Sequence, residues 1–314
     1  MEVIISDIQR MSSEDGPGLR VTAFFKGCSL RCEWCHNPEC IAFHGELIWN
    51  ENRCIRCGTC IGVCPNGCLA FDADTLKIDR AKCVACFRCE DACPGAALEG
   101  KGKAFTPEKL CRELVKDRAY FGTDGGVTLS GGEALMQPGS VEVLQCLKSR
   151  GIQTAVDTCG MVPAETLERA LPFTDIVLYD IKVLDNGLHE KLTGCGNGTI
   201  LENFDLVCRW AEKGGRLWVR TPLIPGATDS PGNIEKIGAL IKSKGASVER
   251  WELCAFNNLC RDKYRRLNIP WKYRETSLLT ESEAKRLAAA AEKTLACAQI
   301  RLTGATMKEG ETNG

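Results

Sequence analysis

Short apolar runs alternate with longer, mixed polar and apolar segments along most of this chain. The apolar runs have the length of buried strands, and the segments between them have the spacing and end signals of helices. Strands are predicted over residues 21–26, 127–130, 154–157, 176–180, 217–221 and 252–254, with a short last strand over 299–302. Helices are predicted over residues 107–119, 141–149, 164–170, 200–213, 233–244 and 281–294. This alternation predicts βαβ units and a parallel sheet.

The number of strands indicates the type of sheet. Six main strands suit an open, partial (β/α)6 barrel better than a closed eight-stranded one, and functional side chains then gather at the carboxyl ends of the strands. Residues 50–100 interrupt the alternation with a stretch rich in Cys, Gly and Pro, so we expect an inserted domain there. The barrel would take residues 1–49 and 101–304, and the polar tail 305–314 is expected to be loose.

Composition narrows the class of protein. The chain has 314 residues, 44 % of them apolar and 26 % charged, which excludes a disordered or fibrous protein. The net charge of −1 makes nucleic acid an unexpected main partner. Neither a secretory signal nor a membrane span is expected, because the first residues are not signal-like and no long apolar run exists. A cytoplasmic protein follows from these expectations.

Cysteine is the unusual feature, with 21 residues, of which 13 fall between Cys28 and Cys93. In a chain that is not secreted, such enrichment indicates metal binding or catalysis rather than disulfides. Eleven of the 13 fall into three groups: one group has the spacing C-x3-C-x2-C, and two groups have the spacing C-x2-C-x2-C-x3-C-P. The two longer groups repeat with a period of 29 residues (83 − 54).

The repeated spacing is that of bacterial ferredoxins with two 4Fe–4S clusters. Three thiolates two residues apart surround one cluster, and the fourth cysteine binds the other cluster. We therefore assign cluster one to Cys54, Cys57, Cys60 and Cys93, and cluster two to Cys83, Cys86, Cys89 and Cys64. Paired zinc sites are the alternative, but zinc ribbons use C-x2-C hooks. Cys68 does not belong to this pattern, and we expect it to act as a small buried apolar residue.

The remaining group supplies only three thiolates, Cys28, Cys32 and Cys35, directly after the first predicted strand. A four-iron cluster with three protein ligands keeps one iron open, as a catalytic metal site requires. A zinc knuckle or a redox C-x2-C pair is the alternative. Other chemical groups also follow strand ends, namely Gly131-Gly132-Glu133, Asp157, Asp180 and Lys182. The sequence therefore predicts one site at this edge of the sheet.

The motifs around these cysteines resemble the radical S-adenosylmethionine (SAM) superfamily. Asp15-Gly-Pro-Gly-Leu-Arg20, Phe25-Lys-Gly-Cys28 and Trp34-Cys-His-Asn-Pro38 are similar to segments of the enzymes that activate glycyl radical enzymes. The resemblance runs from about residue 5 to 302, and the eight-cysteine insert is similar to the longer branch of that family. It implies a radical SAM partial barrel with an inserted, ferredoxin-like domain.

The resemblance also implies a role for each matched residue. SAM would chelate the open iron of the cluster held by the three cysteines, Lys182 would pair with its carboxylate, and Gly132 would let the backbone approach its amino group. A monovalent cation would lie at Asp157 and Asp180, completed by Thr158 and the carbonyl of Leu178. The implied cofactor-binding residues are Trp34, Cys35, His36, Gly132, Asp157, Asp180, Ile181, Lys182 and Asn257.

One position departs from the family pattern. Many members have a histidine in a Pro-Phe-His segment after the last barrel strand, whereas Asn257 takes that place here. Asparagine can hydrogen-bond a ligand but does not titrate near neutral pH, so an acid–base role at this position is in doubt. The basic run at residues 261–266 is expected to be a solvated helix face, with docking of a partner as the less favoured interpretation.

The activity that the resemblance implies is radical chemistry on a protein. Reductive cleavage of SAM would give methionine and a 5′-deoxyadenosyl radical, which would take a hydrogen atom from a backbone glycine of a partner glycyl radical enzyme. Flavodoxin or ferredoxin would be the electron donor, three 4Fe–4S clusters the cofactors, and an anaerobic cytoplasm the setting. The insert would carry electrons, dock a partner or only brace the fold. A peptide-modifying radical SAM maturase and a non-enzymatic electron carrier are the alternatives.

Overall fold

One large sheet forms the body of the protein. The computed structural model describes residues 1–310, and in that range nine strands pair in the order β13-β12-β11-β10-β9-β8-β2-β1-β7. The strands from β2 to β13 run parallel, whereas β1 is antiparallel to both β2 and β7. The strands are β1 (Val3–Ser12), β2 (Arg20–Phe25), β7 (Lys103–Phe105), β8 (Gly126–Gly131), β9 (Thr154–Thr158), β10 (Ile176–Asp180), β11 (Arg216–Leu223), β12 (Arg250–Ala255) and β13 (Gln299–Thr303).

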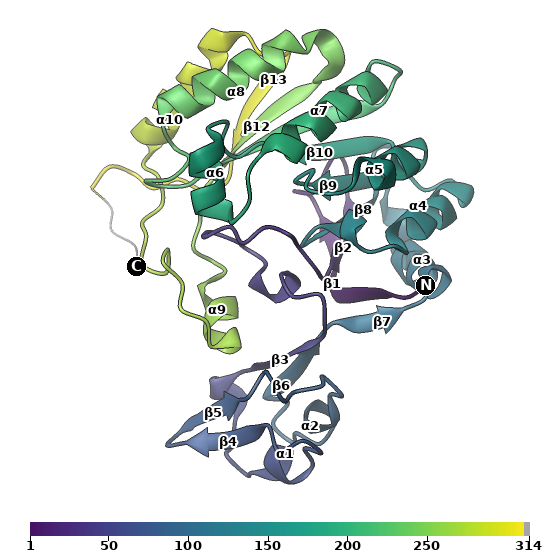
Figure 1. Cartoon of the computed structure of the whole chain (residues 1–314), viewed down its shortest axis with the longest axis vertical. Helices are drawn as coiled ribbons and strands as arrows, with labels where there is room; N and C mark the ends of the chain where they lie inside the picture. Colours follow the sequence, from purple (N-terminus) through teal and green to yellow (C-terminus); the bar gives the residue numbers. More distant parts are fainter. Residues whose placement is uncertain (311–314) are drawn as a thin grey trace.

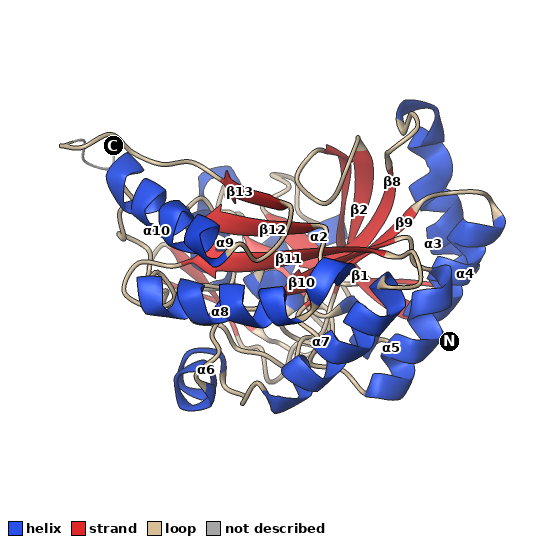
Figure 2. Cartoon of the chain, turned by 90° about the horizontal axis from the view of Figure 1, so that it is seen from above, coloured by secondary structure: helices blue, strands red, loops and turns tan. Residues whose placement is uncertain are grey.

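Helices cover the outer face of this sheet, with α4, α5, α7 and α8 side by side along it (Figure 2). The apolar sides of these helices and of the strands form the main core, which is rich in Val, Ile and Leu. The helices of the body are α3 (Pro107–Leu114), α4 (Ser140–Ser149), α5 (Ala164–Ala170), α6 (Asn186–Thr193), α7 (Gly198–Ala211), α8 (Pro231–Ser243), α9 (Arg261–Leu267) and α10 (Glu281–Thr294). Parallel strands covered by helices make the partial barrel that the sequence predicted.

All six predicted main strands are present, and the short last strand is β13. The strands β1 and β7 were not predicted. Polar residues interrupt β1, so it shows no continuous apolar run, and β7 has only three residues. Both lie at one edge of the sheet, where half of each strand faces solvent and apolar patterning is weak.

Arg20 shows that part of the family-like motif before β2 is structural. Its guanidinium is fully buried and donates hydrogen bonds to Thr128 Oγ1 at 2.7 Å and to Gln153 Oε1 at 2.8 Å. Gly18 has a φ of +68°, and a Cβ there would lie 2.5 Å from the backbone nitrogen of Gly125. The loop that ends at Arg20 therefore closes over the start of β2 and β8.

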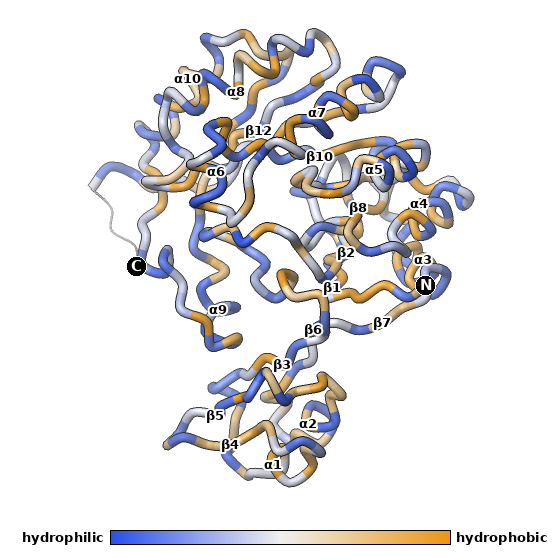
Figure 3. Tube along the Cα trace, in the orientation of Figure 1, coloured by the Kyte–Doolittle hydropathy of each residue, from blue (hydrophilic) through white to orange (hydrophobic). Residues whose placement is uncertain are grey.

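The cysteine-rich insert extends from one end of the body (Figure 1). Its stem is the antiparallel pair β3 (Glu46–Trp49) and β6 (Leu98–Lys101), so the insert begins slightly before the predicted residue 50 and ends at residue 101. Beyond the stem lie α1 (Thr59–Gly62), β4 (Leu69–Asp72), β5 (Thr75–Ile78) and α2 (Arg88–Asp91). The insert has a small apolar core of its own, visible as orange segments in Figure 3.

Helix α9 joins the insert to the body. Arg266 pairs with Glu99 of the stem at 2.7 Å, and Arg80 of the insert donates to the carbonyl oxygen of Leu267 at 2.7 Å. Lys263 pairs with Glu39 at 2.6 Å. The expectation of a solvated helix face at residues 261–266 therefore holds only in part. Arg261, Asp262 and Arg265 are exposed, but the other side of the helix lies against β3 and the segment that leads into it.

The described part of the C-terminal tail, residues 305–310, contacts the start of α10. Met307 pairs with Thr280 in an isolated parallel bridge, and the backbone nitrogen of Ser282 donates to Glu309 at 2.9 Å. Residues 305–310 thus contact the start of α10 rather than hang free, and the rest of the tail lies outside the described residues. Among the described helices, none is long and apolar enough to cross a membrane.

Candidate active site

The loop that carries Cys28, Cys32 and Cys35 is held from both sides. It leaves β2 through Gly27, which has a φ of +98° and donates its backbone N–H to the carbonyl of Cys40 at 2.8 Å. Further along, the N–H of Arg31 donates to the carbonyl of Thr193 at 2.6 Å. These backbone bonds fix the three thiols at the carboxyl end of the sheet.

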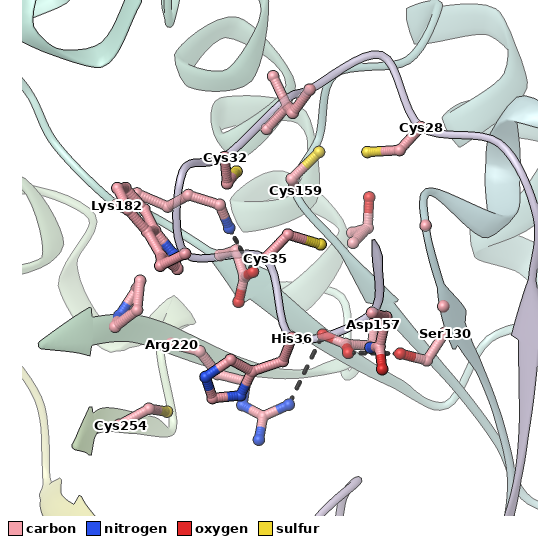
Figure 4. Close-up of a pocket in the computed structure, with 18 of the residues that line it drawn as sticks. Cys28, Cys32, Cys35, His36, Ser130, Asp157, Cys159, Lys182, Arg220 and Cys254 are labelled. Carbon is pink, nitrogen blue, oxygen red and sulfur yellow. Dashed lines mark hydrogen bonds and ion pairs between the residues drawn. The ribbon is translucent and has the colours of Figure 1, made fainter. Parts of the chain in front are cut away.

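The three thiols face a cavity of about 280 Å³ at the carboxyl ends of the parallel strands. Figure 4 shows the cysteine loop on one side and the side chains from β8 to β12 on the other. Nine of the predicted site residues line this cavity, namely Cys28, Cys32, Trp34, Cys35, His36, Gly132, Asp157, Asp180 and Lys182. The strand-end residues of the sequence analysis therefore meet in one place.

Two predicted residues lie beside the cavity rather than in its wall. Ile181 is buried, and its backbone N–H donates to the carbonyl of Arg220 at 2.9 Å. The Oδ1 atom of Asn257 accepts from the backbone nitrogen of Leu259 at 3.2 Å, so this side chain stabilises the turn after β12. The residue before it, Phe256, lines the cavity instead.

The buried Lys182 pairs with the half-buried Asp180 in the cavity wall. Burial disfavours the charged ammonium, but Asp180 and the nearby thiols outweigh burial and hold the pKa of Lys182 above its ordinary value. The Asn233 amide donates to the carbonyl of Lys182 at 3.0 Å and fixes its backbone. Lys182 is therefore a fixed positive charge within the cavity, in a place that suits a ligand carboxylate.

Asp157 contacts two residues that sequence reasoning did not assign to the site. The hydroxyl of Ser130 donates to its Oδ2 atom at 2.7 Å, and Arg220 Nη1 lies 3.7 Å from its Oδ1 atom. Burial raises the pKa of Asp157 to about 7, although the Arg220 charge opposes that rise. The sequence did contain a hint of this role, because Arg220 is a charged residue inside the otherwise apolar run of β11.

Glu133 forms a second network below the cysteine loop. Its carboxylate is fully buried and accepts hydrogen bonds from the Thr158 hydroxyl at 2.8 Å, the Cys159 nitrogen at 2.9 Å and the Cys159 thiol at 3.2 Å. Burial raises the pKa of Glu133. The Cys159 thiol also interacts with Cys28, so this network reaches the first cysteine of the loop. The sequence analysis did not place Cys159 in the site.

Gly132 is required by packing at this point. A Cβ there would lie 2.4 Å from the carbonyl oxygen of Gly27 and 2.6 Å from that of Cys40. Gly131 has a φ of +111°, and a Cβ there would lie 2.4 Å from the backbone nitrogen of Phe25. The end of β8 can therefore contact the cysteine loop only where both residues are glycine. This packing requirement explains the Gly131-Gly132 pair in addition to the role that the resemblance implies.

The aromatic side of the cavity contains one unsatisfied polar atom. His36 Nε2 is buried and has no hydrogen-bond partner among the described residues, an arrangement that calls for a ligand group. Burial lowers the pKa of His36. Trp34 lines the same side and packs in the cluster that contains Phe256 and Trp271. An apolar ring with a hydrogen-bonding edge, such as adenine, fits this wall.

The insert gathers its cysteines in two small pockets. Cradle one is the pocket with Cys54, Cys57, Cys60 and Cys93, and cradle two is the pocket with Cys64, Cys83, Cys86 and Cys89. Each cradle combines three thiols of one repeat with the fourth thiol of the other, which is the grouping that the spacing predicted. Four thiols around a small pocket are the donor set that a 4Fe–4S cluster needs.

Comparison with known proteins identifies the family. A model described as the radical SAM superfamily matches residues 80–235, and one described as a 4Fe–4S dicluster domain matches residues 53–97. The trans-4-hydroxy-L-proline dehydratase activating enzyme of Clostridioides difficile is 38 % identical over 91 % of this chain and 94 % of that protein. The chain belongs to the glycyl radical enzyme activating enzymes.

A second relative supports the same family assignment. The isethionate sulfite-lyase activating enzyme of Desulfovibrio desulfuricans is 40 % identical over 88 % of this chain and 89 % of that protein. The solved structure of Streptococcus suis SuiB with SAM gives a TM-score of 0.50 at 14 % identity, over 65 % of this chain and 45 % of that one, and shares the fold alone. This glycyl radical enzyme activating enzyme is thus a radical SAM enzyme, rather than a maturase or a simple electron carrier.

Proposed function

We propose that this activating enzyme binds SAM in the cavity below the Cys28–Cys35 loop and holds three 4Fe–4S clusters. The observation that carries the proposal is the meeting of three thiols, the Lys182–Asp180 pair and the orphaned His36 nitrogen in one cavity. When bound there and reduced, a cluster with one open iron supplies the electron that cleaves a carbon–sulfur bond of SAM. The partner is a glycyl radical enzyme, as for the relatives.

Different side chains of the cavity would contact different parts of SAM. Cys28, Cys32 and Cys35 would hold the cluster and leave one iron open for the ligand. Lys182 neutralises that carboxylate, and His36 donates or accepts at the adenine edge. The apolar wall around Trp34 excludes water from the reacting end, so that the cleavage products stay in the cavity.

The carboxylates of the cavity are a proposed site for a monovalent cation. Asp157 and Asp180 would supply oxygen ligands, and Leu178 pairs with Asp157 across β9 and β10, two residues before Asp180. The Thr158 hydroxyl donates its proton to Glu133, so only the lone pairs of its oxygen could contribute to the cation site. Comparing SAM cleavage in sodium, potassium and choline buffers tests this part of the proposal, because only a bound cation makes the rate depend on the ion.

The clusters of the insert are proposed to pass electrons from flavodoxin or ferredoxin towards the cavity. Low-potential clusters with four thiolate ligands commonly carry electrons, and the insert is packed on the body through α9 and the stem. An open iron is labile to oxygen, so we place the enzyme in an anaerobic cytoplasm. Removing the insert clusters while the cavity is intact should slow reduction by the protein donor, but not reduction by a small chemical reductant.

The central experiment measures SAM cleavage by the full chain. Protein reconstituted anaerobically with iron and sulfide is reduced, SAM is added, and 5′-deoxyadenosine is quantified. The variant Cys35→Ala should give no product, whereas Cys208→Ala, which removes a buried thiol of α7, should match the wild type. Product that persists in Cys35→Ala, or no product from a wild type with about twelve irons (three four-iron clusters), would contradict the proposal.

A further inference from the structure

Cradle two contains a fifth thiol that the ferredoxin pattern does not use. Cys68 is 6 % exposed and lines this cradle together with the four predicted ligands. Its Sγ atom lies 3.3 Å from the Sγ atom of Cys64, the ligand that comes from the other repeat. Five thiols therefore surround one cradle, whereas the described residues around the other cradle supply four.

The internal repeat provides the comparison that shows what Cys68 adds. Cys68 and Ala97 are 29 residues apart and occupy the same place in the two halves. The nitrogen of Cys68 donates to Cys64 Sγ at 3.4 Å, and the nitrogen of Ala97 donates to Cys93 Sγ at 3.2 Å. The backbone is thus alike in both cradles, and the two positions differ by one sulfur atom.

Packing alone does not account for that sulfur. Ala97 is 2 % exposed and fills the equivalent place with a methyl group, in the same small core of the insert. A thiol aimed at a neighbouring ligand thiol is instead placed for iron chemistry, since thiolates are the preferred ligands of iron–sulfur clusters. The position is fixed, because the carbonyl of Cys68 also accepts the N–H of Asp79 at 2.8 Å.

We propose that Cys68 is a reserve ligand of cluster two, able to take the coordination place of Cys64. In the exchange one iron–sulfur bond to Cys64 breaks and one to Cys68 forms, while the thiol proton of Cys68 passes to Cys64. No electrons are gained or lost. This inference rests on the proposed clusters of the insert, and it predicts that cluster two survives the loss of one ligand whereas cluster one does not.

The test uses full-length protein that lacks the cluster in the active site. The variant Cys28→Ala/Cys32→Ala/Cys35→Ala, called the insert-only background, removes the open-iron cluster, whose own oxidation products would obscure the measurement. It should bind about eight irons per chain (two four-iron clusters). A four-iron cluster that lacks a protein ligand loses that iron on oxidation, which leaves a three-iron cluster with a paramagnetic resonance signal.

In the insert-only background, Cys64→Ala should keep about eight irons and show no three-iron signal after oxidation. Adding Cys68→Ala to it should give that signal, and Cys68→Ala alone should change nothing. Cys93→Ala should give the signal directly, because position 97 is alanine. Adding Ala97→Cys to Cys93→Ala should then remove the signal, which is a gain that poor folding cannot produce.

Two results would overturn the inference, and they differ from a failure of the proposed function. A three-iron signal in Cys64→Ala equal to that in Cys93→Ala would show that Cys68 does not bind iron. A signal that Ala97→Cys fails to remove would show that this position cannot reach the cluster. If the insert-only background binds no iron at all, the proposed clusters themselves are wrong, together with the inference that rests on them.

Discussion

The hydroxyl of Tyr264 in α9 donates a hydrogen bond to the carbonyl oxygen of Cys35 at 2.8 Å. The same helix contacts the stem of the insert through Arg266 and Glu99. One short helix therefore touches both the third cysteine of the active-site loop and the domain with the other eight cysteines. It is one of the contacts between the two cysteine-rich parts of the enzyme, beside the ion pairs Lys26–Glu46 and Lys101–Asp7 at the stem.

Replacing Tyr264 with phenylalanine should destabilise the cysteine loop. The carbonyl of Cys35 would keep only the weak, 3.9 Å contact with the Cys260 thiol, and the loss of the hydroxyl donor costs about 1–3 kcal/mol. We expect Tyr264→Phe to lower the melting temperature of the reconstituted protein by a few degrees (about 2–4 °C per kcal/mol) and to slow SAM cleavage. Tyr273→Phe is the control, since that hydroxyl makes only a 3.4 Å contact with Glu33. Equal losses in both variants would show that the Cys35 bond is unimportant.

Lys182 should govern SAM affinity rather than cluster content. Its ammonium is buried in the cavity wall, and removing the charged partner of a buried ligand carboxylate costs about 2–5 kcal/mol of binding free energy. Lys182→Met should therefore weaken SAM binding by at least about thirtyfold (about 2 kcal/mol), measured by equilibrium dialysis of unreduced protein, with iron content unchanged.

The control for this prediction is Lys148→Met, which breaks the exposed Lys148–Asp175 pair at the opposite end of β10. Surface pairs of that kind contribute little, so SAM affinity should stay at the wild-type value. A Lys182→Met protein that binds SAM normally would exclude the proposed contact with the ligand carboxylate. A loss of iron in that variant would indicate a structural role instead.

Sequence reasoning found the parts of this site that follow strand ends. Asp157, Asp180 and Lys182 end apolar runs, and parallel strands bring such positions to one edge, so their meeting could be foreseen. The cysteine groups were equally readable, because their spacing matches the ligand geometry of iron–sulfur clusters. These features depend on local patterns that a single chain displays.

The rest depends on contacts between distant segments. Arg220 lies within a strand, and only the packing of β11 beside β10 and β12 directs it towards Asp157. Cys159 and Glu133 meet under the cysteine loop through a hydrogen bond that joins residues 26 apart. The antiparallel β1 was missed because Asp7 and Arg10 break its apolar run. None of these relationships has a periodic signal in the sequence.

Gly132 should be intolerant of even one added carbon. An alanine Cβ would lie within 2.6 Å of two carbonyl oxygens, so either the loop or the strand must move. Overpacking of this kind costs about 1–3 kcal/mol. We expect Gly132→Ala to lower the melting temperature and to reduce iron bound at the three-cysteine site, since the loop that carries these thiols would be displaced.

Gly232→Ala is the matched control, because that glycine lies in the first turn of α8 with open space around it. Its melting temperature should be unchanged or slightly higher, as alanine restricts the unfolded chain by about 0.4–1 kcal/mol. If Gly132→Ala behaves like Gly232→Ala, the close approach of β8 to the cysteine loop is not a constraint on the site.

Arg266 should hold the insert against the body. It pairs with Glu99 at 2.7 Å, and both side chains are partly exposed, so the pair contributes at most about 1 kcal/mol. Arg266→Ala should therefore speed hydrogen exchange in the stem strands β3 and β6 by up to about fivefold (about 1 kcal/mol), measured by mass spectrometry. Exchange in the central strands of the body should not change.

The neighbouring variant separates this contact from a general effect on α9. Arg265 pairs with Asp262 of its own helix at 2.6 Å, so Arg265→Ala should leave exchange in the stem unchanged. Combining Arg266→Ala with Glu99→Ala should add less than the two single effects, because both remove the same interaction. Fully additive effects would mean that the Arg266–Glu99 pair does not couple the insert to α9, and that other contacts, such as the hydrogen bond of Arg80, hold the insert.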